Sequence, residues 1–106
     1  MPFYKIRRNW QIQARTTHTV HLHVREGFFN DKIYLYVDDQ QVVEAQAGLV
    51  GASGYALFEI DGRTHEFRWI WNMLIGNPTS IVIMHKGHIL AQYGSDRAAQ
   101  DDILDS

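Results

Sequence analysis

His21 and His23 form the one arrangement in this sequence that has the spacing of a metal site. Residues i and i+2 of a β-strand project to the same face, as a metal-binding β-barrel requires of its ligands. The same face would also carry Thr19 and Arg25, which indicates that it faces solvent. Two outward histidines lack the third and fourth ligands of a zinc site. We therefore expect surface histidines here and keep metal binding as the alternative.

The other residues that could take part in catalysis lie at unpromising positions. His85 and His88 flank a Lys86-Gly87 turn, where they would face each other at an exposed hairpin tip. His65 is expected at the rim of the core, with its hydrogen bonds satisfied. The sequence contains no cysteine, no Ser-His-Asp order and no phosphate-binding glycine loop, and its carboxylates gather in turns and at the C-terminal end. We expect no enzyme activity, no metal and no cofactor.

Two tyrosines indicate a surface for contact with another protein. In the expected strand 32–38, Ile33, Leu35 and Val37 occupy one face, which leaves Tyr34 and Tyr36 on the other. Tyrosine is common at interfaces because its ring buries area while its hydroxyl keeps a hydrogen-bond partner. If this strand neighbours 19–25, the two tyrosines would join the outward histidines. The candidate interaction surface therefore consists of Tyr34, Tyr36, His21 and His23.

A hairpin over residues 56–71 must organise the elements that position these side chains. Its two alternating segments meet at Asp61-Gly62, and an Asp-Gly pair between such segments is a strong signal for a two-residue type I′ turn. That turn places Phe58 opposite His65 and Ala56 opposite Phe67 on an apolar face, which continues through Trp69 and Trp71. The aromatic stripe Phe67, Trp69 and Trp71 is expected to form core rather than to line a ligand pocket.

The remaining segments also alternate with period two. Strands are expected over residues 10–15, 19–25, 32–38, 42–46, 80–84 and 89–93, with a β-bulge or a longer loop between the third and the fourth. The last two segments are apolar on both faces, which is typical of a central position in a sheet. About seven or eight short strands joined by hairpins predict an all-β antiparallel sandwich, with a small β-barrel as the alternative.

Length and charge limit the domain organisation and the partners. We expect a single domain over residues 1–94 of the 106, followed by an acidic, flexible tail over 95–106. The net charge of −2 argues against a nucleic-acid partner. The basic residues of the first quarter indicate a solvated edge strand, with a basic arm that binds phosphates as the alternative. No apolar run is long enough to span a membrane and the N-terminus does not resemble a signal peptide. We predict no membrane partner and a cytoplasmic location.

The order of these segments resembles the Fas apoptotic inhibitory molecule (FAIM) family. The resemblance runs from about Trp10 to Tyr93 and rests on hairpin patterns. These are Trp10-Gln-Ile-Gln, His18-Thr-Val-His-Leu-His, Asp31-Lys-Ile-Tyr-Leu-Tyr-Val-Asp-Asp, Phe58-Glu-Ile-Asp-Gly, and Ile81-Val-Ile-Met with Ile89-Leu-Ala-Gln-Tyr. Asp39 stands where a turn glycine is usual in that family, and the longer members carry two domains where this chain has room for one.

The resemblance implies a sandwich of two antiparallel sheets without enzymatic activity. It also implies a role in protein interaction, as in apoptosis inhibition or suppression of aggregation. No residue of these motifs can be assigned to either role. We therefore expect a non-enzymatic domain that contacts an unknown protein partner or a second copy of the chain. The competing hypothesis is a barrel that binds a metal or a small ligand through His21 and His23, conceivably an enzyme.

Overall fold

The computed structural model describes residues 4–48, 52–72, 74 and 76–94, and these residues form eight antiparallel β-strands. The strands are β1 (Tyr4–Gln13), β2 (Thr17–Arg25), β3 (Asn30–Val37), β4 (Gln40–Gly48), β5 (Ser53–Ile60), β6 (Arg63–Asn72), β7 (Asn77–His85) and β8 (His88–Tyr93). The predicted all-β fold of seven or eight short strands is confirmed. The predicted tail over 95–106 lies outside the described residues.

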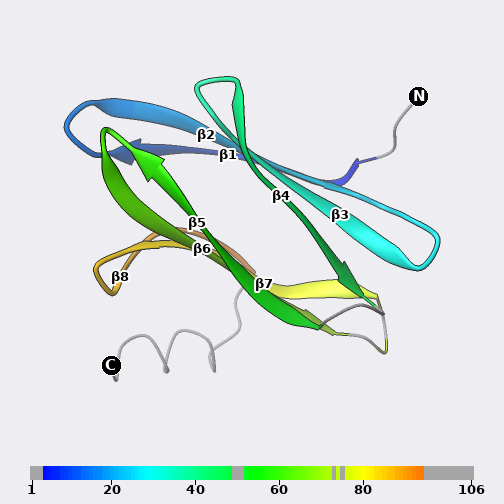
Figure 1. Cartoon of the computed structure of the whole chain (residues 1–106). Helices are drawn as coiled ribbons and strands as arrows, with labels where there is room; N and C mark the ends of the chain where they lie inside the picture. The colour runs from blue at the N-terminus through cyan, green and yellow to red at the C-terminus, as the bar shows by residue number, and fades with distance from the viewer. Residues whose placement is uncertain (1–3, 49–51, 73, 75, 95–106) are drawn as a thin grey trace.

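The strands form two four-stranded sheets in sequence order (Figure 1). The first sheet contains β1 to β4 and the second contains β5 to β8, so every neighbouring pair is consecutive along the chain. The sheets pack face to face as a β-sandwich. Because each sheet is open and has two edge strands, the barrel alternative is wrong. The charged β1 is one of these edges, and charged side chains on an edge disfavour pairing with another chain.

The β5–β6 hairpin has the predicted register. Asp61 and Gly62 have φ angles of 54° and 75°, as a type I′ turn requires. Phe58 stands opposite His65 and Ala56 opposite Phe67. Phe67, Trp69 and Trp71 are buried in a core built from both sheets, which confirms that the aromatic stripe is core. A Cβ atom at Gly54 would lie 2.6 Å from the Trp69 ring, so only glycine fits beneath that indole.

The β3–β4 hairpin contains the predicted bulge. Its turn is Asp38-Asp39, with both residues at positive φ, and the register shifts between Leu35 and Tyr36. The shift places Val43 opposite Leu35, so that valine rather than Glu44 enters the core. The bulge therefore keeps a carboxylate out of the apolar interior.

Strands β1 and β7 begin earlier than their apolar alternation predicts. β1 starts at Tyr4 instead of residue 10, because Ile6 is buried opposite Val24 and pairing with β2 extends the strand past its charged residues. β7 starts at Asn77 instead of residue 80, and Pro78 is tolerated there because it lies at the beginning of the strand. Tertiary pairing overrides local composition in both cases.

A buried carboxylate joins the two sheets at the end where β3 begins. Asp31 Oδ2 accepts a hydrogen bond from Trp71 Nε1 at 2.9 Å and one from Lys5 Nζ at 2.7 Å. Lys5 also donates to the Gly76 carbonyl at 2.8 Å. The β1–β2 register shifts between Tyr4 and Ile6, so Lys5 lies in a β-bulge. From this position its ammonium group reaches both Asp31 of the same sheet and the loop that follows β6.

Candidate interaction surface

The four predicted interaction residues lie together on the outer face of the first sheet. Val20, Leu22 and Val24 of β2 are buried, so the histidines between them face outward, as predicted. β2 pairs with β3 such that His21 stands opposite Tyr36 and His23 opposite Tyr34. All four side chains are partly exposed. We call His21, His23, Tyr34 and Tyr36, with Tyr4, the aromatic surface.

Tyr4 joins this surface from β1, and the sequence did not predict it. Its ring centroid lies 4.9 Å from that of His23, which in turn lies 5.2 Å from Tyr36 and 6.3 Å from His21. The guanidinium carbon of Arg7 lies 5.4 Å from the Tyr4 ring centroid, within the range of a cation–π interaction. Tyr4 was missed because strand 1 was expected to begin at residue 10.

A hydrogen bond and a nearby carboxylate orient the His21 ring. Its Nδ1 donates to the Asn9 side-chain oxygen across the β1–β2 pair. Its Nε2 lies 3.7 Å from an Asp39 carboxylate oxygen at the β3–β4 turn. His21 is therefore held by one neighbour on β1 and one at the β3–β4 turn, which reduces the rotamer entropy that the ring would lose on binding a partner.

Partial burial favours the neutral forms of His23 and Tyr36 on the aromatic surface. Burial lowers the pKa of His23, and the nearby charges of Arg7 and His21 lower it further. Burial raises the pKa of Tyr36, with smaller contributions from Tyr4, Tyr34 and Glu44. Neutral imidazole and phenol groups offer both donors and acceptors at the edges of apolar rings. This combination suits contact with another protein surface.

The structure gives the metal hypothesis little geometric support. The Nδ1 atom of His21 is protonated in its bond to Asn9, which leaves only Nε2 as a ligand. Within residues 4–48, 52–72, 74 and 76–94, no three His, Cys, Asp or Glu side chains are placed to hold one metal ion.

A second polar cluster, which the sequence did not predict, lies where three turns meet. His18 Nδ1 donates to Asp38, and its Nε2 lies 3.0 Å from Asp61 Oδ1. Thr16 Oγ1 lies 2.9 Å from the same Nε2, and the Thr16 backbone amide donates to Asp61 Oδ2 at 2.9 Å. The cluster joins the β1–β2 turn of the first sheet to the β5–β6 turn of the second.

The order hydroxyl, imidazole, carboxylate in this cluster resembles a nucleophilic triad, but its electrostatics oppose that role. Hydrogen bonds to Asp38 and Asp61 raise the pKa of His18, while bonds to the Thr16 amide and to His18 lower the pKa of Asp61 to about 2. The two carboxylates favour the protonated form of His18, which has no lone pair to accept the threonine proton. We interpret this cluster as a structural link between the sheets.

The remaining histidines also have structural contacts. His65 is buried and its Nδ1 donates to the Arg63 carbonyl at 2.8 Å, in agreement with the predicted satisfied position. Burial lowers the pKa of His65. His85 stacks on His65 at 4.5 Å and donates to the Thr64 carbonyl. His85 stands opposite His88, as expected for a two-residue Lys86-Gly87 turn.

Several large hydrophobic side chains are exposed outside the aromatic surface, and the sequence reasoning passed over them. Phe28 and Phe29 lie in the β2–β3 loop, Leu74 lies in the β6–β7 loop, and Tyr55 and Leu57 lie on the outer face of the second sheet. The consecutive phenylalanines inside a polar loop were a signal that could have been read from the sequence.

A scan against protein-family models, a search of curated proteins and a search of solved structures each found no match for this chain. Among the described residues, no helix has the length and apolar character needed to cross a membrane.

Proposed function

We propose that this chain is a non-enzymatic protein-interaction domain that contacts its partner through the aromatic surface. The observation that carries the proposal is the continuous set of ring contacts from Tyr4 through His23 to Tyr36, on a face turned away from the core. Rings that already pack against one another lose little side-chain entropy on binding. Tyrosines on a preformed sheet are therefore suited to act as interface anchors.

The resemblance to the FAIM family supports the same proposal. It implies a sandwich of two antiparallel sheets and a role through protein contact, and the chain has such a sandwich. We extend the proposal to a cytoplasmic domain of apoptosis-inhibitor-like or anti-aggregation type. Its partner is a protein that the sequence does not identify, or a second copy of the chain.

The proposal is tested by the double variant Tyr34→Ala, Tyr36→Ala. Both side chains are partly exposed and face away from the core, so the variant should melt near the wild-type temperature. Sedimentation velocity and a pull-down should show weaker self-association or weaker partner capture. The matched control is Tyr55→Ala, Leu57→Ala on the outer face of the second sheet, which should leave association unchanged.

Two outcomes would contradict the proposal. Equal association of the well-folded double variant and the wild type would exclude this face as the contact surface. Loss of association in the Tyr55→Ala, Leu57→Ala control alone would move the contact to the second sheet. Collapse of the Tyr34→Ala, Tyr36→Ala variant would show that the tyrosines support the fold. The association test would then be repeated with the variant Tyr34→Ser, Tyr36→His.

A further inference from the structure

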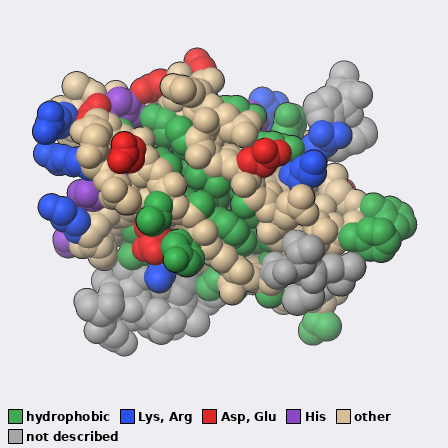
Figure 2. Space-filling model, in the orientation of Figure 1, with side chains coloured by type: hydrophobic (Ala, Val, Ile, Leu, Met, Phe, Trp, Pro, Cys, Tyr) green, Lys and Arg blue, Asp and Glu red, His purple; other side chains and the backbone are tan. Residues whose placement is uncertain are grey.

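The two ends of the sandwich differ in chemistry. At one end the turns are tight and polar, and they contain Asp38, Asp39 and Asp61. At the other end the β2–β3 and β6–β7 loops carry exposed phenylalanine and leucine (Figure 1). In the space-filling view, hydrophobic side chains protrude from this second end, below a group of basic side chains (Figure 2). We call this the loop end.

The β2–β3 loop presents two phenylalanines to solvent. Phe28 is 93% exposed and Phe29 is 66% exposed, and their rings pack edge to face with centroids 4.6 Å apart. A Cβ atom at Gly27 would lie 2.0 Å from the Asn30 carbonyl oxygen, so this loop conformation requires glycine there. The chain therefore specifies a tight loop whose tip consists of apolar rings.

A neighbouring loop adds a third exposed apolar side chain. Leu74, in the β6–β7 loop, is 97% exposed, and its amide donates to the Asn72 side chain at 3.0 Å. Both loops line one hollow of about 310 Å³, the first through Phe28 and Phe29 and the second through Gly76. The apolar tips of two loops thus lie at the same end of the molecule.

Two cations stand directly opposite each other beside this loop end. Arg25 and Lys32 are cross-strand partners on the outer face, and within the described residues neither forms an ion pair. Like charges in direct cross-strand pairs are unfavourable. A bound anion would reduce this repulsion, so the pair is suited to an anionic ligand.

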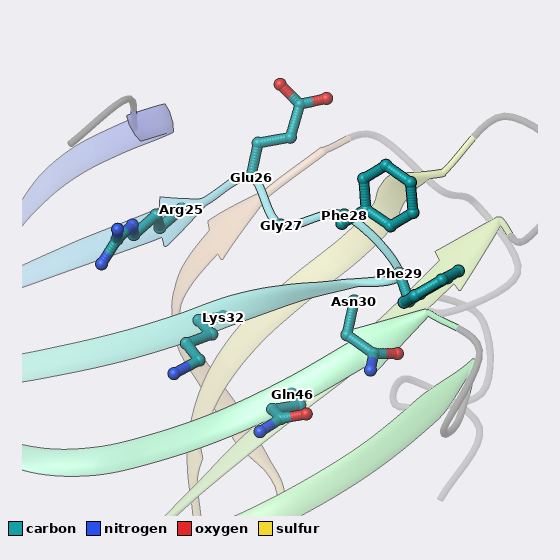
Figure 3. Close-up of a pocket in the computed structure, with 8 residues that line it drawn as sticks. All are labelled: Arg25, Glu26, Gly27, Phe28, Phe29, Asn30, Lys32 and Gln46. Carbon is teal, nitrogen blue, oxygen red and sulfur yellow. The ribbon is translucent and has the colours of Figure 1, made fainter.

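The cations and the aromatic loop border a single hollow of about 360 Å³. Figure 3 shows Arg25, Lys32 and Gln46 along the sheet side of this hollow, and the Phe28-Phe29 segment beyond them. The Glu26 carboxylate points away from both cations in this view. Positive charge and apolar rings are therefore adjacent, with no carboxylate of this loop directed between them.

We propose that the loop end docks on the surface of an anionic phospholipid bilayer. Arg25 and Lys32 would contact the phosphate and carboxylate groups of the lipids, while Phe28, Phe29 and Leu74 enter the headgroup region. One partner then satisfies both features, since apolar insertion and attraction to anionic lipid add together at a membrane interface. The sequence predicts no membrane partner because it lacks a spanning segment, but peripheral docking needs no such segment.

Two observations favour a bilayer over a nucleic acid. Leu74 lies on a different loop from the phenylalanines and offers no ring on which a base could stack. The two phenylalanine rings pack edge to face at a loop tip and so present no flat platform. The acidic turns, with Asp38, Asp39 and Asp61, lie at the opposite end and would point away from an anionic surface.

The test is cosedimentation of the full chain with vesicles of phosphatidylcholine alone and of phosphatidylcholine with phosphatidylserine. We expect binding to the anionic vesicles, weakened by added salt. Phe28→Ala, Phe29→Ala should reduce this binding by about tenfold or more, and so should Arg25→Gln, Lys32→Gln. Because these experiments use lipid and the test of the aromatic surface uses protein alone, failure of one is distinguishable from failure of the other.

Matched controls use exposed residues elsewhere on the molecule. Tyr55 and Leu57 are 64% and 60% exposed on the second sheet, so Tyr55→Ala, Leu57→Ala should bind vesicles as the wild type does. Arg63→Gln, Lys86→Gln at the polar end should also retain binding. Thermal melts of all variants should coincide, because the substituted side chains are exposed.

Four results would overturn the proposal. The first is no sedimentation of the wild type with either vesicle. The second is full binding by the Phe28→Ala, Phe29→Ala variant. The third is loss of vesicle binding when inorganic phosphate is added, with phosphate binding unchanged in the Phe28→Ala, Phe29→Ala variant. That result would show a site for soluble anions. The fourth is self-association without vesicles that this phenylalanine variant loses, which would assign the loop end to a second copy of the chain.

Discussion

The ring of His23 lies 5.2 Å from the ring of Tyr36, although the residue directly opposite His23 is Tyr34. Diagonal neighbours on a sheet are farther apart at Cβ than direct partners, but aromatic side chains are long enough to meet across that distance. The diagonal contact, together with that of Tyr4, makes the aromatic surface one continuous feature across three strands.

A pair of double-mutant cycles tests this diagonal contact. The His23→Ala and Tyr36→Ala cycle should give a coupling of about 0.5–1 kcal/mol in the free energy of unfolding. The His23→Ala and Tyr34→Ala cycle should give a smaller value, because no ring contact joins that pair within the described residues. Urea denaturation supplies the free energies. A larger coupling for the direct pair would contradict the diagonal arrangement.

The link made by His18 predicts a pH-dependent contribution to stability. The raised pKa of His18 stabilises the fold at pH values below its unfolded value of 6.5, and this contribution is lost as pH rises through the higher folded value. The lowered pKa values of Asp38 and Asp61 stabilise the fold above 3.8, and that contribution is lost as pH falls toward about 2 for Asp61. The link should therefore be strongest between these two limits.

The measurement is urea unfolding of the wild type and of His18→Asn as a function of pH. The difference in the free energy of unfolding should be greatest between about pH 4 and pH 6.5 and should shrink on both sides. A difference that stays constant from acid to neutral pH would show that His18 contributes only packing.

The buried Trp69 predicts the cost of removing a core aromatic side chain. It is 7% exposed and packs on Gly54 and near Phe67, so Trp69→Ala should lower the free energy of unfolding by about 3–5 kcal/mol. The neighbouring Ile70, which faces out of the sheet, serves as the control, and Ile70→Ala should change it by less than about 0.5 kcal/mol. Equal effects in a denaturant melt would undo the assignment of the two faces of β6.

Removing the buried carboxylate of Asp31 should also lower the free energy of unfolding, because its hydrogen bonds are lost. Asp31 is 6% exposed and accepts hydrogen bonds from Trp71 Nε1 and Lys5 Nζ. Asp31→Ala leaves both donors without this acceptor and should lower the free energy of unfolding by about 2–4 kcal/mol. Asp31→Asn, which keeps an acceptor but loses the charge, should fall between. A loss below about 0.5 kcal/mol for Asp31→Ala, by denaturant melting, would contradict a structural role.

The sequence predicted the strands whose two faces differ clearly. The alternation around Leu22 and Leu35 identified the inner face of the first sheet, and Asp61-Gly62 fixed a register that the structure confirms. The bulge near Tyr36 was predicted because the simple register would have buried Glu44. These features depend on local pattern, which a single sequence contains.

Features that depend on contacts between distant segments were not predictable in the same way. Asp31 lies just outside the predicted strand 32–38, and nothing local shows that Lys5 and Trp71 meet it from other strands. The meeting of His18 with Asp61 requires the packing of one sheet on the other. The candidate surface was named from its four central residues, whereas Tyr4 joins it only through the long pairing of β1 with β2.

The most direct measurement of the central claim is photo-crosslinking from a single introduced cysteine, because the chain has no cysteine of its own. Glu44 lies on the outer face of the first sheet opposite Tyr34, and Glu59 lies on the outer face of the second sheet opposite Thr64. Each Glu→Cys variant is labelled with the same photoreactive maleimide and irradiated with the protein it associates with. Contact through the aromatic surface predicts crosslinks from Glu44→Cys and few from Glu59→Cys. Crosslinks from Glu59→Cys alone would contradict the account.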